Sequence, residues 1–186
     1  VLLFPFANVL VKMSERLIPD HGEVEEKKYV HLDKRMLMGP SFAFDAIRQE
    51  IIHMGTLALE NISFSRDVLV NPDHFAKMEE NEQKIDEYQK ELANYLEKFD
   101  ASTLPPREQV EMQHAMLMIN HIERISDYCM NIRDSAKDML DEKMSEYTIE
   151  DINTISSQAY KTMKYALKMR ESYDIDHYEK VEKHEN

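Results

Sequence analysis

The stretch of sequence that decides the fold runs from residue 112 to residue 136 and reads MQHAMLMINHIERISDYCMNIRDSA. Its apolar residues recur at steps of three and four, which is the repeat of one face of an α-helix. A helix with one apolar face needs partner helices to cover that face, so the stretch predicts a helical bundle. The face predicted to point inward contains Met112, Ala115, Ile119, Ile122, Cys129, Ile132 and Ala136.

The same spacing continues in other segments, and helix-breaking residues separate them. Gly39-Pro40, Asn71-Pro72 and Pro105-Pro106 lie between the segments, and proline is favoured at the first position of a helix. Thr148 to Asp151 resembles a capping box and predicts another helix start. No segment alternates with a period of two for long enough to predict a strand. We therefore predict an all-α antiparallel bundle with helices at 41–70, 73–99, 106–142 and 148–172, and a largely helical segment at 1–18.

The last predicted helix, 148–172, also has an apolar face. Its predicted inward residues again follow steps of three and four along the helix. They are Ile152, Ile155, Ala159, Met163, Ala166 and Met169.

Composition narrows the class of function. The 186 residues include 36 Asp and Glu against 23 Lys and Arg, a formal net charge of −13. Nucleic-acid binding needs a basic surface, so this chain is not expected to bind nucleic acid. The single cysteine, Cys129, cannot form an intrachain disulfide and suits a reducing compartment. The sequence contains no glycine-rich phosphate loop, nucleophile elbow or HExxH motif, so we do not expect an enzyme.

The two ends of the chain differ from its centre. Residues 1–11 are nearly all apolar but too short to span a bilayer, because eleven helical residues rise only about 16 Å. We interpret 1–19 as the end of a membrane or interfacial segment; the alternative is an ordinary amphipathic helix docked on the bundle. Residues 20–40 are charged and form a predicted linker to a bundle at 41–186. The first residue, Val1, and the charged stretch after Tyr173 predict that the chain is a segment of a longer protein.

Two pairs of carboxylates, each spaced four residues apart, lie beside the apolar faces of neighbouring helices. Glu82 and Asp86 belong to 73–99, and Glu123 and Asp127 belong to 106–142. Residues four apart lie one turn above each other on the same side of a helix. A cation held between the two helices would relieve both the burial and the repulsion of these charges. The other interpretation is that all four face water or pair with Lys and Arg.

The segment INHIERISDYCMNI, residues 119–132, resembles the ERI-(G/A/S)-D…N-I motif of PhoU-like phosphate-transport regulators. The preceding helix, with EQKIDEY at 82–88, is similar to the (D/E)…ID motif of the same family. The resemblance implies a bundle of long helices with one complete three-helix unit and the start of a second, truncated unit from about 148. It also implies metal ligands at Glu82, Asp86, Glu123 and Asp127, with a divalent or ferric ion (Mg, Ca, Mn or Fe) as the cofactor.

A second resemblance narrows the family. The stretch HLDKR at 31–35, with Pro40, Ala46 and Glu50 after it, resembles the join in bacterial sodium/phosphate cotransporters of the type II-related family. There a membrane domain leads into a PhoU-like domain on the cytoplasmic side of the membrane. The resemblance implies a regulatory domain whose partners are the transport domain of the same polypeptide, a second copy of itself, metal ions and phosphate. The alternative is a ligand-free dimerisation or scaffold domain of a membrane protein.

Overall fold

The computed structural model describes residues 40–68, 71, 73–139, 145–172, 180–181 and 183. The chain divides into two compact units, Val1–Val30 and His31–Asn186, and all the described residues belong to the second. The predictions for 1–19 and for most of the linker therefore lie outside the described residues. In the part of the chain that is described, no helix is long and apolar enough to cross a membrane.

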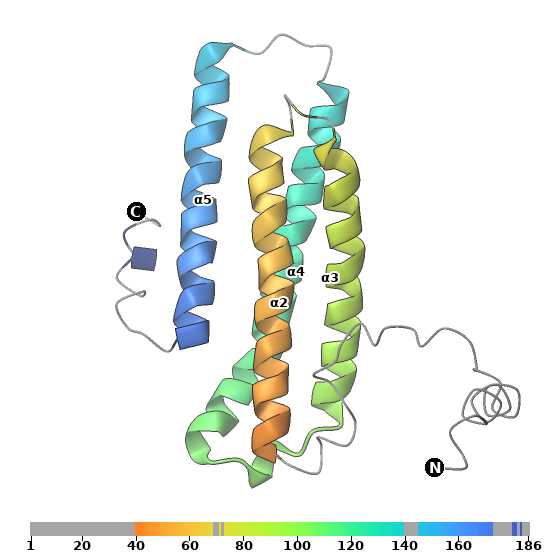
Figure 1. Ribbon diagram of the computed structural model, residues 1–186, viewed down its shortest axis with the longest axis vertical. Helices are drawn as coiled ribbons and strands as arrows, with labels where there is room; N and C mark the ends of the chain where they lie inside the picture. The colour runs from red at the N-terminus through yellow and green to blue at the C-terminus, as the bar shows by residue number, and fades with distance from the viewer. Residues whose placement is uncertain are drawn as a thin grey trace, which may run out of the picture. The chain divides into compact units, whose positions relative to one another are not determined.

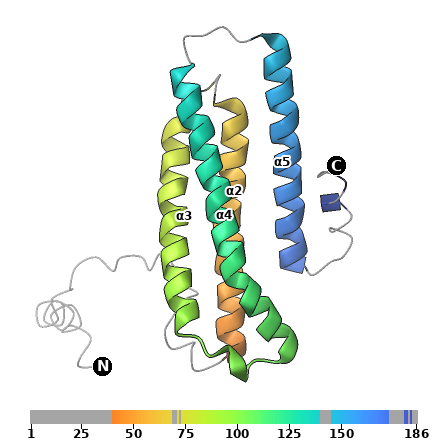
Figure 2. The ribbon, with the colours of Figure 1, turned by 180° about the vertical axis from the view of Figure 1, so that it is seen from behind.

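Four long helices make up the described structure, and within it there is no strand. They are α2 (Pro40–Asp67), α3 (His74–Glu97), α4 (Pro106–Asp138) and α5 (Glu146–Ser172), with a short 3-10 helix, η3 (Ala101–Thr103), before α4. Consecutive long helices run in opposite directions, and α5 and α3 lie on opposite flanks of α2 (Figures 1 and 2). The predicted all-α antiparallel bundle is confirmed.

Helix α2 is the centre of the bundle, because α3, α4 and α5 all pack against it. Helices α2, α3 and α4 also close on one another as a three-helix unit, whereas α5 packs mainly on α2. Gly55 permits this approach, since a Cβ atom at that position would lie 2.4 Å from Cδ2 of Leu167 on α5.

The helix starts follow the proline signals in two of the four cases. Pro40 is the first residue of α2, and Pro106 is the first residue of α4. The predicted start at Thr148 is wrong by two residues, because α5 begins at Glu146. The reason is the residue before it: the Oγ of Ser145 accepts a hydrogen bond from the backbone N–H of Thr148 at 3.1 Å. Ser145 therefore satisfies an N–H of the first turn that has no partner within the helix.

The core is apolar and continuous through the three-helix unit. Ile51, Met54, Ile85, Leu92 and Ile119 are all fully buried. Most of the inward face predicted for α4 is confirmed, since Met112, Ala115, Ile119, Ile122, Cys129 and Ala136 are buried.

Three apolar residues predicted to point inward instead face solvent, one on α4 and two on α5. Ile132 on α4 is 47% exposed and Ile155 on α5 is 69% exposed. On an ideal helix Ile132 lies about 80° from Ile122, whereas Arg133 lies only about 20° from it. Arg133 takes the inward position and is 8% exposed. On α5, Ala159 is also exposed and only Met163 is buried, because this helix is covered from one side.

Candidate functional site

The four carboxylates predicted to bind a metal lie along the seam between α3 and α4. These two helices pack directly against each other. Glu82 and Asp86 on α3 and Glu123 on α4 are partly buried, and Asp127 on α4 is exposed. The seam therefore places three carboxylates at the boundary between the core and solvent, with the fourth just outside it.

Glu82 lies close enough to the other three carboxylates for their charges to affect its pKa. Burial raises the pKa of Glu82 above its ordinary value, and the charges of Asp86, Asp127 and Glu123 raise it further. A hydrogen bond from Ser126 opposes this rise in pKa. A partly buried carboxylate surrounded by like charges is more easily neutralised, by a proton or by a cation, than one in water.

The pKa of Glu123, on the α4 side of the seam, is also raised by neighbouring negative charges. Burial makes the largest contribution to the raised pKa of Glu123, and the charges of Asp127 and Asp86 raise it further. The guanidinium of Arg124 lowers the pKa of Glu123 and is the smallest of these influences. Arg124 itself donates a hydrogen bond to the Tyr128 hydroxyl at 3.3 Å. The cluster is therefore only weakly compensated by positive charge.

The hydroxyl of Ser126 links Glu82 to the core of the bundle. Ser126, on α4, donates a hydrogen bond to Oε2 of Glu82. The Oγ of Ser126 accepts a hydrogen bond from Nδ2 of Asn61, on α2, at 3.0 Å. Asn61 and Ser126 are both fully buried. A chain of side chains thus crosses from α2 through α4 to α3 and ends on one of the predicted ligands.

Sequence analysis did not identify Asn61 and Ser126 as parts of this site. Asn61 could have been noticed, because it interrupts the apolar face of α2 between Ala58 and Ile62. Ser126 could have been noticed too, since it lies one turn after Ile122 on the inward face of α4. What the sequence does not contain is the pairing of these two residues, which depends on the packing of α2 against α4.

The donor set suits a hard cation, since it consists of carboxylate oxygens. The four groups are nevertheless not gathered around one point. Among the residues whose positions are described, no group of three or more His, Cys, Asp or Glu side chains is arranged to hold a metal ion. Side-chain rotations that brought the carboxylates together would bring like charges together, which is unfavourable unless a cation is bound.

The pKa shifts predict a pH dependence of stability. For a carboxyl whose pKa is raised by folding, the folded state binds the proton more tightly than the unfolded state does. Without added metal, the contribution of Glu82 to the free energy of unfolding should therefore be largest below its ordinary pKa and fall as pH rises through the raised value. We expect Glu82→Gln to stabilise the domain at pH 7 and to lose this advantage near pH 4, as measured by urea unfolding. Equal effects at both values would contradict the prediction.

Other residues of α4 whose side chains can bind metals do not form a site within the part of the chain that is described. His114 and His121 are both exposed on α4. Cys129 is buried and unbridged, and burial raises the pKa of its thiol, which makes it a poor nucleophile. Glu111 and His114 have the Glu-x-x-His spacing of di-iron bundles, but Glu111 pairs with Arg107 at 3.5 Å and with Arg170 at 3.4 Å.

A second buried carboxylate lies between α2 and α3. Glu50 is 1% exposed, and its Oε2 lies 3.6 Å from Nδ1 of His53. Burial and the neighbouring Glu50 raise the pKa of Tyr88, on α3, to about 12. Tyr88 therefore keeps its proton at neutral pH and hydrogen-bonds to Glu50. This contact gives the buried side chain of Glu50 a polar partner, and it is separate from the four seam carboxylates.

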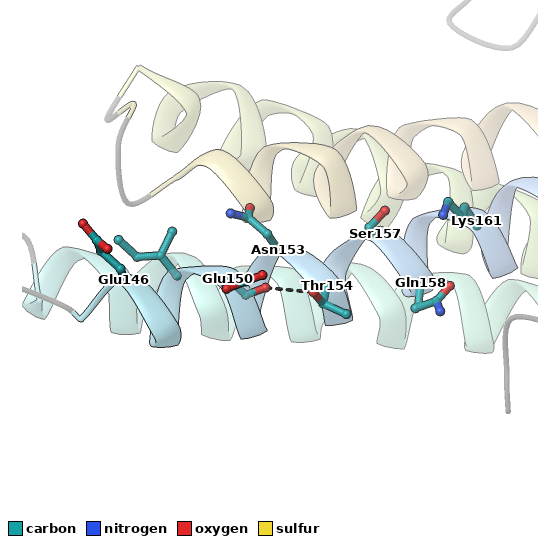
Figure 3. A pocket seen from close by; sticks show the side chains of 8 residues that line it. Glu146, Glu150, Asn153, Thr154, Ser157, Gln158 and Lys161 are labelled. Atoms are coloured by element: carbon teal, nitrogen blue, oxygen red, sulfur yellow. Dashed lines mark hydrogen bonds between the residues drawn. The ribbon is translucent and has the colours of Figure 1, made fainter.

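Two hollows in the described structure lie away from the seam. A groove of about 480 Å³ runs along α5, and Figure 3 shows Asn153, Ser157 and Lys161 on it. It is lined by residues of α5 alone, among them Glu146, Glu150 and Lys161. A smaller hollow of about 320 Å³ lies between the first turns of α2 and α4.

The smaller hollow contains two arginines, which would suit an anion such as phosphate. Each has an acidic neighbour, however. Arg48 lies 3.6 Å from Asp45 and Arg107 lies 3.5 Å from Glu111. With Glu108 also in its lining, the hollow carries no excess of positive charge, and we do not assign an anion site to it.

Comparisons with known proteins support the assignment of the central helices. No curated protein and no solved structure matches the chain. The family description of the PhoU domain, in contrast, matches residues 51–136. The matched range contains most of α2, all of α3 and nearly all of α4, and with them Asn61, Ser126 and the four carboxylates. Residues 51–136 are thus similar to the PhoU domain.

Proposed function

We propose that this chain is the regulatory domain of a sodium-dependent phosphate transporter and binds metal ions between α3 and α4. The ligands are Glu82, Asp86, Glu123 and Asp127. One observation carries the proposal: within the range that matches the PhoU domain, four carboxylates lie along two packed helices, and charges from this group raise the pKa values of Glu82 and Glu123. A structural seam would gain stability from opposite charges, so like charges at this seam call for a ligand.

A cation would supply the positive charge that offsets the four carboxylates of the seam. Its charge offsets the repulsion among the carboxylates, and its coordination compensates for the water that Glu82 and Glu123 lose on burial. Oxygen ligands select hard ions, so Mg²⁺, Ca²⁺, Mn²⁺ and Fe³⁺ are the proposed ions. Binding would link α3 to α4 at a position where no Lys or Arg of the described residues pairs with Glu82.

Two observations support the proposal that this domain is part of a transporter. Residues 51–136 match the PhoU domain, and residues 31–50 resemble the join that precedes such domains in sodium/phosphate cotransporters. In this proposal the domain lies on the cytoplasmic side of the membrane, and its partner is the transport domain of the same polypeptide. A cation that binds one arrangement of α3 and α4 more tightly would shift the transporter between conformations by that difference in affinity.

The proposal is tested by equilibrium dialysis of the purified chain against Mn²⁺ at neutral pH, after treatment with a chelator. We expect saturable binding, and we expect Glu123→Gln/Asp127→Asn to remove it. The control is Glu150→Gln/Asp151→Asn on α5, which removes the same charge from two exposed positions. Equal binding by both double variants would mean that Mn²⁺ is held by general surface charge. The chain would then be a ligand-free dimerisation or scaffold domain.

The proposed association of two copies of the chain can be tested by substitutions on α5. Tyr147, Ile149 and Ile155 on this helix are 81%, 40% and 69% exposed, and exposed apolar groups of this kind favour association. We expect the chain to self-associate, and we expect Ile155→Glu to lower the mass measured by light scattering at high concentration. Thr154→Glu, at the adjacent exposed position, is the control and should leave the mass unchanged. A monomeric wild type would contradict this proposal.

A further inference from the structure

We infer that α5 is a detachable helix, which is held on α2 by its C-terminal half and can leave the bundle while α2, α3 and α4 stay folded. The observation that carries this inference is that the two halves of α5 differ in burial. The inference goes beyond the proposed function and does not depend on the proposed metal site.

The first turns of α5 lie outside the packed part of the bundle. Within 146–155, every residue except Ile152 is exposed. Within 160–170, in contrast, only Lys161 and Lys168 are exposed. The attachment of α5 to the described part of the chain therefore lies in its C-terminal half.

The register of α5 on α2 explains this difference. The two helices run antiparallel, and Leu167 of α5 lies against Gly55 of α2. Because both helices rise by the same distance per residue, Asp67, the last residue of α2, lies opposite about residue 155 of α5. The first turns of α5 therefore extend beyond the end of α2, as Figures 1 and 2 show.

The C-terminal half of α5 is attached by contacts that lie close together. Leu167 approaches α2 so closely that a Cβ atom at Gly55 would lie 2.4 Å from its Cδ2. Almost one turn further along α5, Nη1 of Arg170 lies 3.4 Å from Oε2 of Glu111 on α4, and these two side chains are 15% and 16% exposed. Separation of these contacts would release the whole of α5, since its first turns add little attachment of their own.

The other three long helices form a core without α5. Helices α2, α3 and α4 each pack against the other two, whereas Met163 is the one buried side chain that α5 adds to the core. Elements with few buried apolar contacts open at a lower free energy than the core does. Detachment of α5 would uncover the side of α2 around Gly55, which is buried when α5 is in place. Helix α5 thus acts as a strap over this side of α2.

The test is hydrogen–deuterium exchange of the full chain at low protein concentration, followed by mass spectrometry. The exchange rate of a protected backbone amide depends on how often its hydrogen bond opens. We expect amides within 160–170 to exchange at least about 10-fold faster than the most protected amides of α2, α3 and α4. Equal rates in all four helices would mean that α5 opens only when the whole domain unfolds, and would overturn the inference.

Substitutions on both sides of the contact locate the attachment. Leu167→Ala removes most of a partly buried side chain, so it should speed exchange in α5 by about a further 10-fold and leave α3 and α4 unchanged. Gly55→Leu should also speed exchange in α5, because its side chain would occupy the space of Leu167. The matched controls are Lys168→Ala and Thr56→Leu, which change the adjacent exposed residues and should leave exchange in α5 unchanged.

The controls decide whether the effect comes from the contact. If Lys168→Ala speeds exchange in α5 as much as Leu167→Ala does, the effect belongs to the helix itself and the inference is wrong. The inference is also wrong if Leu167→Ala or Gly55→Leu speeds exchange in α3 and α4 as much as in α5. Should one of these two variants fail to fold, as judged by circular dichroism, the other variant and the wild-type rates decide.

Discussion

Saturating Mn²⁺ should raise the melting temperature of the wild-type chain by about 5–10 °C. A ligand at 100 times its dissociation constant adds about 2.7 kcal/mol to the free energy of unfolding. In a protein of this size, 1 kcal/mol shifts the melting temperature by about 2–4 °C. The double substitution Glu123→Gln/Asp127→Asn should abolish the rise, because it removes both ligands on α4. Thermal unfolding followed by circular dichroism, with and without the ion, measures the effect.

The control variant for this experiment has the same net charge as the variant with both substitutions on α4. Glu150→Gln/Asp151→Asn neutralises two exposed acids on α5, outside the range matched by the PhoU domain. This variant should keep the full rise in melting temperature. A rise that survives in the α4 variant would mean that the ion binds elsewhere, and no rise with Mg²⁺, Ca²⁺, Mn²⁺ or Fe³⁺ would mean that the four carboxylates are ordinary surface charges.

A large effect on stability is expected from Ile119→Ala on α4. Ile119 is fully buried in the core of the three-helix unit. Removing its outer carbons should lower the free energy of unfolding by about 2–5 kcal/mol, through lost burial and the cavity that remains. Ile132→Ala makes the same chemical change on the same helix, at a side chain that is 47% exposed. It should cost less than about 1 kcal/mol.

Urea unfolding of the two variants decides which face of α4 points inward. The arrangement described here requires Ile119→Ala to be clearly the more damaging substitution. Equal losses would mean that Ile132 is buried as well, as the spacing of apolar residues had predicted. The hydrogen bond from Ser126 to Glu82 would then need to be reconsidered, since it depends on the same rotation of α4.

The sequence predicted the helices well because the signals that define them are local. Each long helix has its own apolar spacing, and Pro40 and Pro106 mark two of the starts. The errors arose where tertiary packing decides the outcome. Ile155 continues the spacing of α5, yet α5 packs mainly on α2 and leaves that side exposed. Which helices cover a given face depends on the assembly, and no local pattern contains that information.

The residues of the candidate site were also predictable only in part. Spacing and the family resemblance led to Glu82, Asp86, Glu123 and Asp127, because residues four apart must share one side of a helix. Helix α3 packs against α4, and neighbouring carboxylates raise the pKa values of Glu82 and Glu123, while metal binding by the four residues stays a prediction. The contact between Asn61 and Ser126 was not predictable, because it joins residues 65 positions apart in the chain.

The most direct test of the metal site is anomalous diffraction from crystals of the chain grown or soaked with Mn²⁺. The ion should appear as a peak in the anomalous difference map between α3 and α4, at metal–oxygen distances of about 2.0–2.6 Å from the carboxylates. Crystals that contain saturating Mn²⁺ but show no peak at this seam, with all four carboxylates in contact with solvent, would contradict the proposed site.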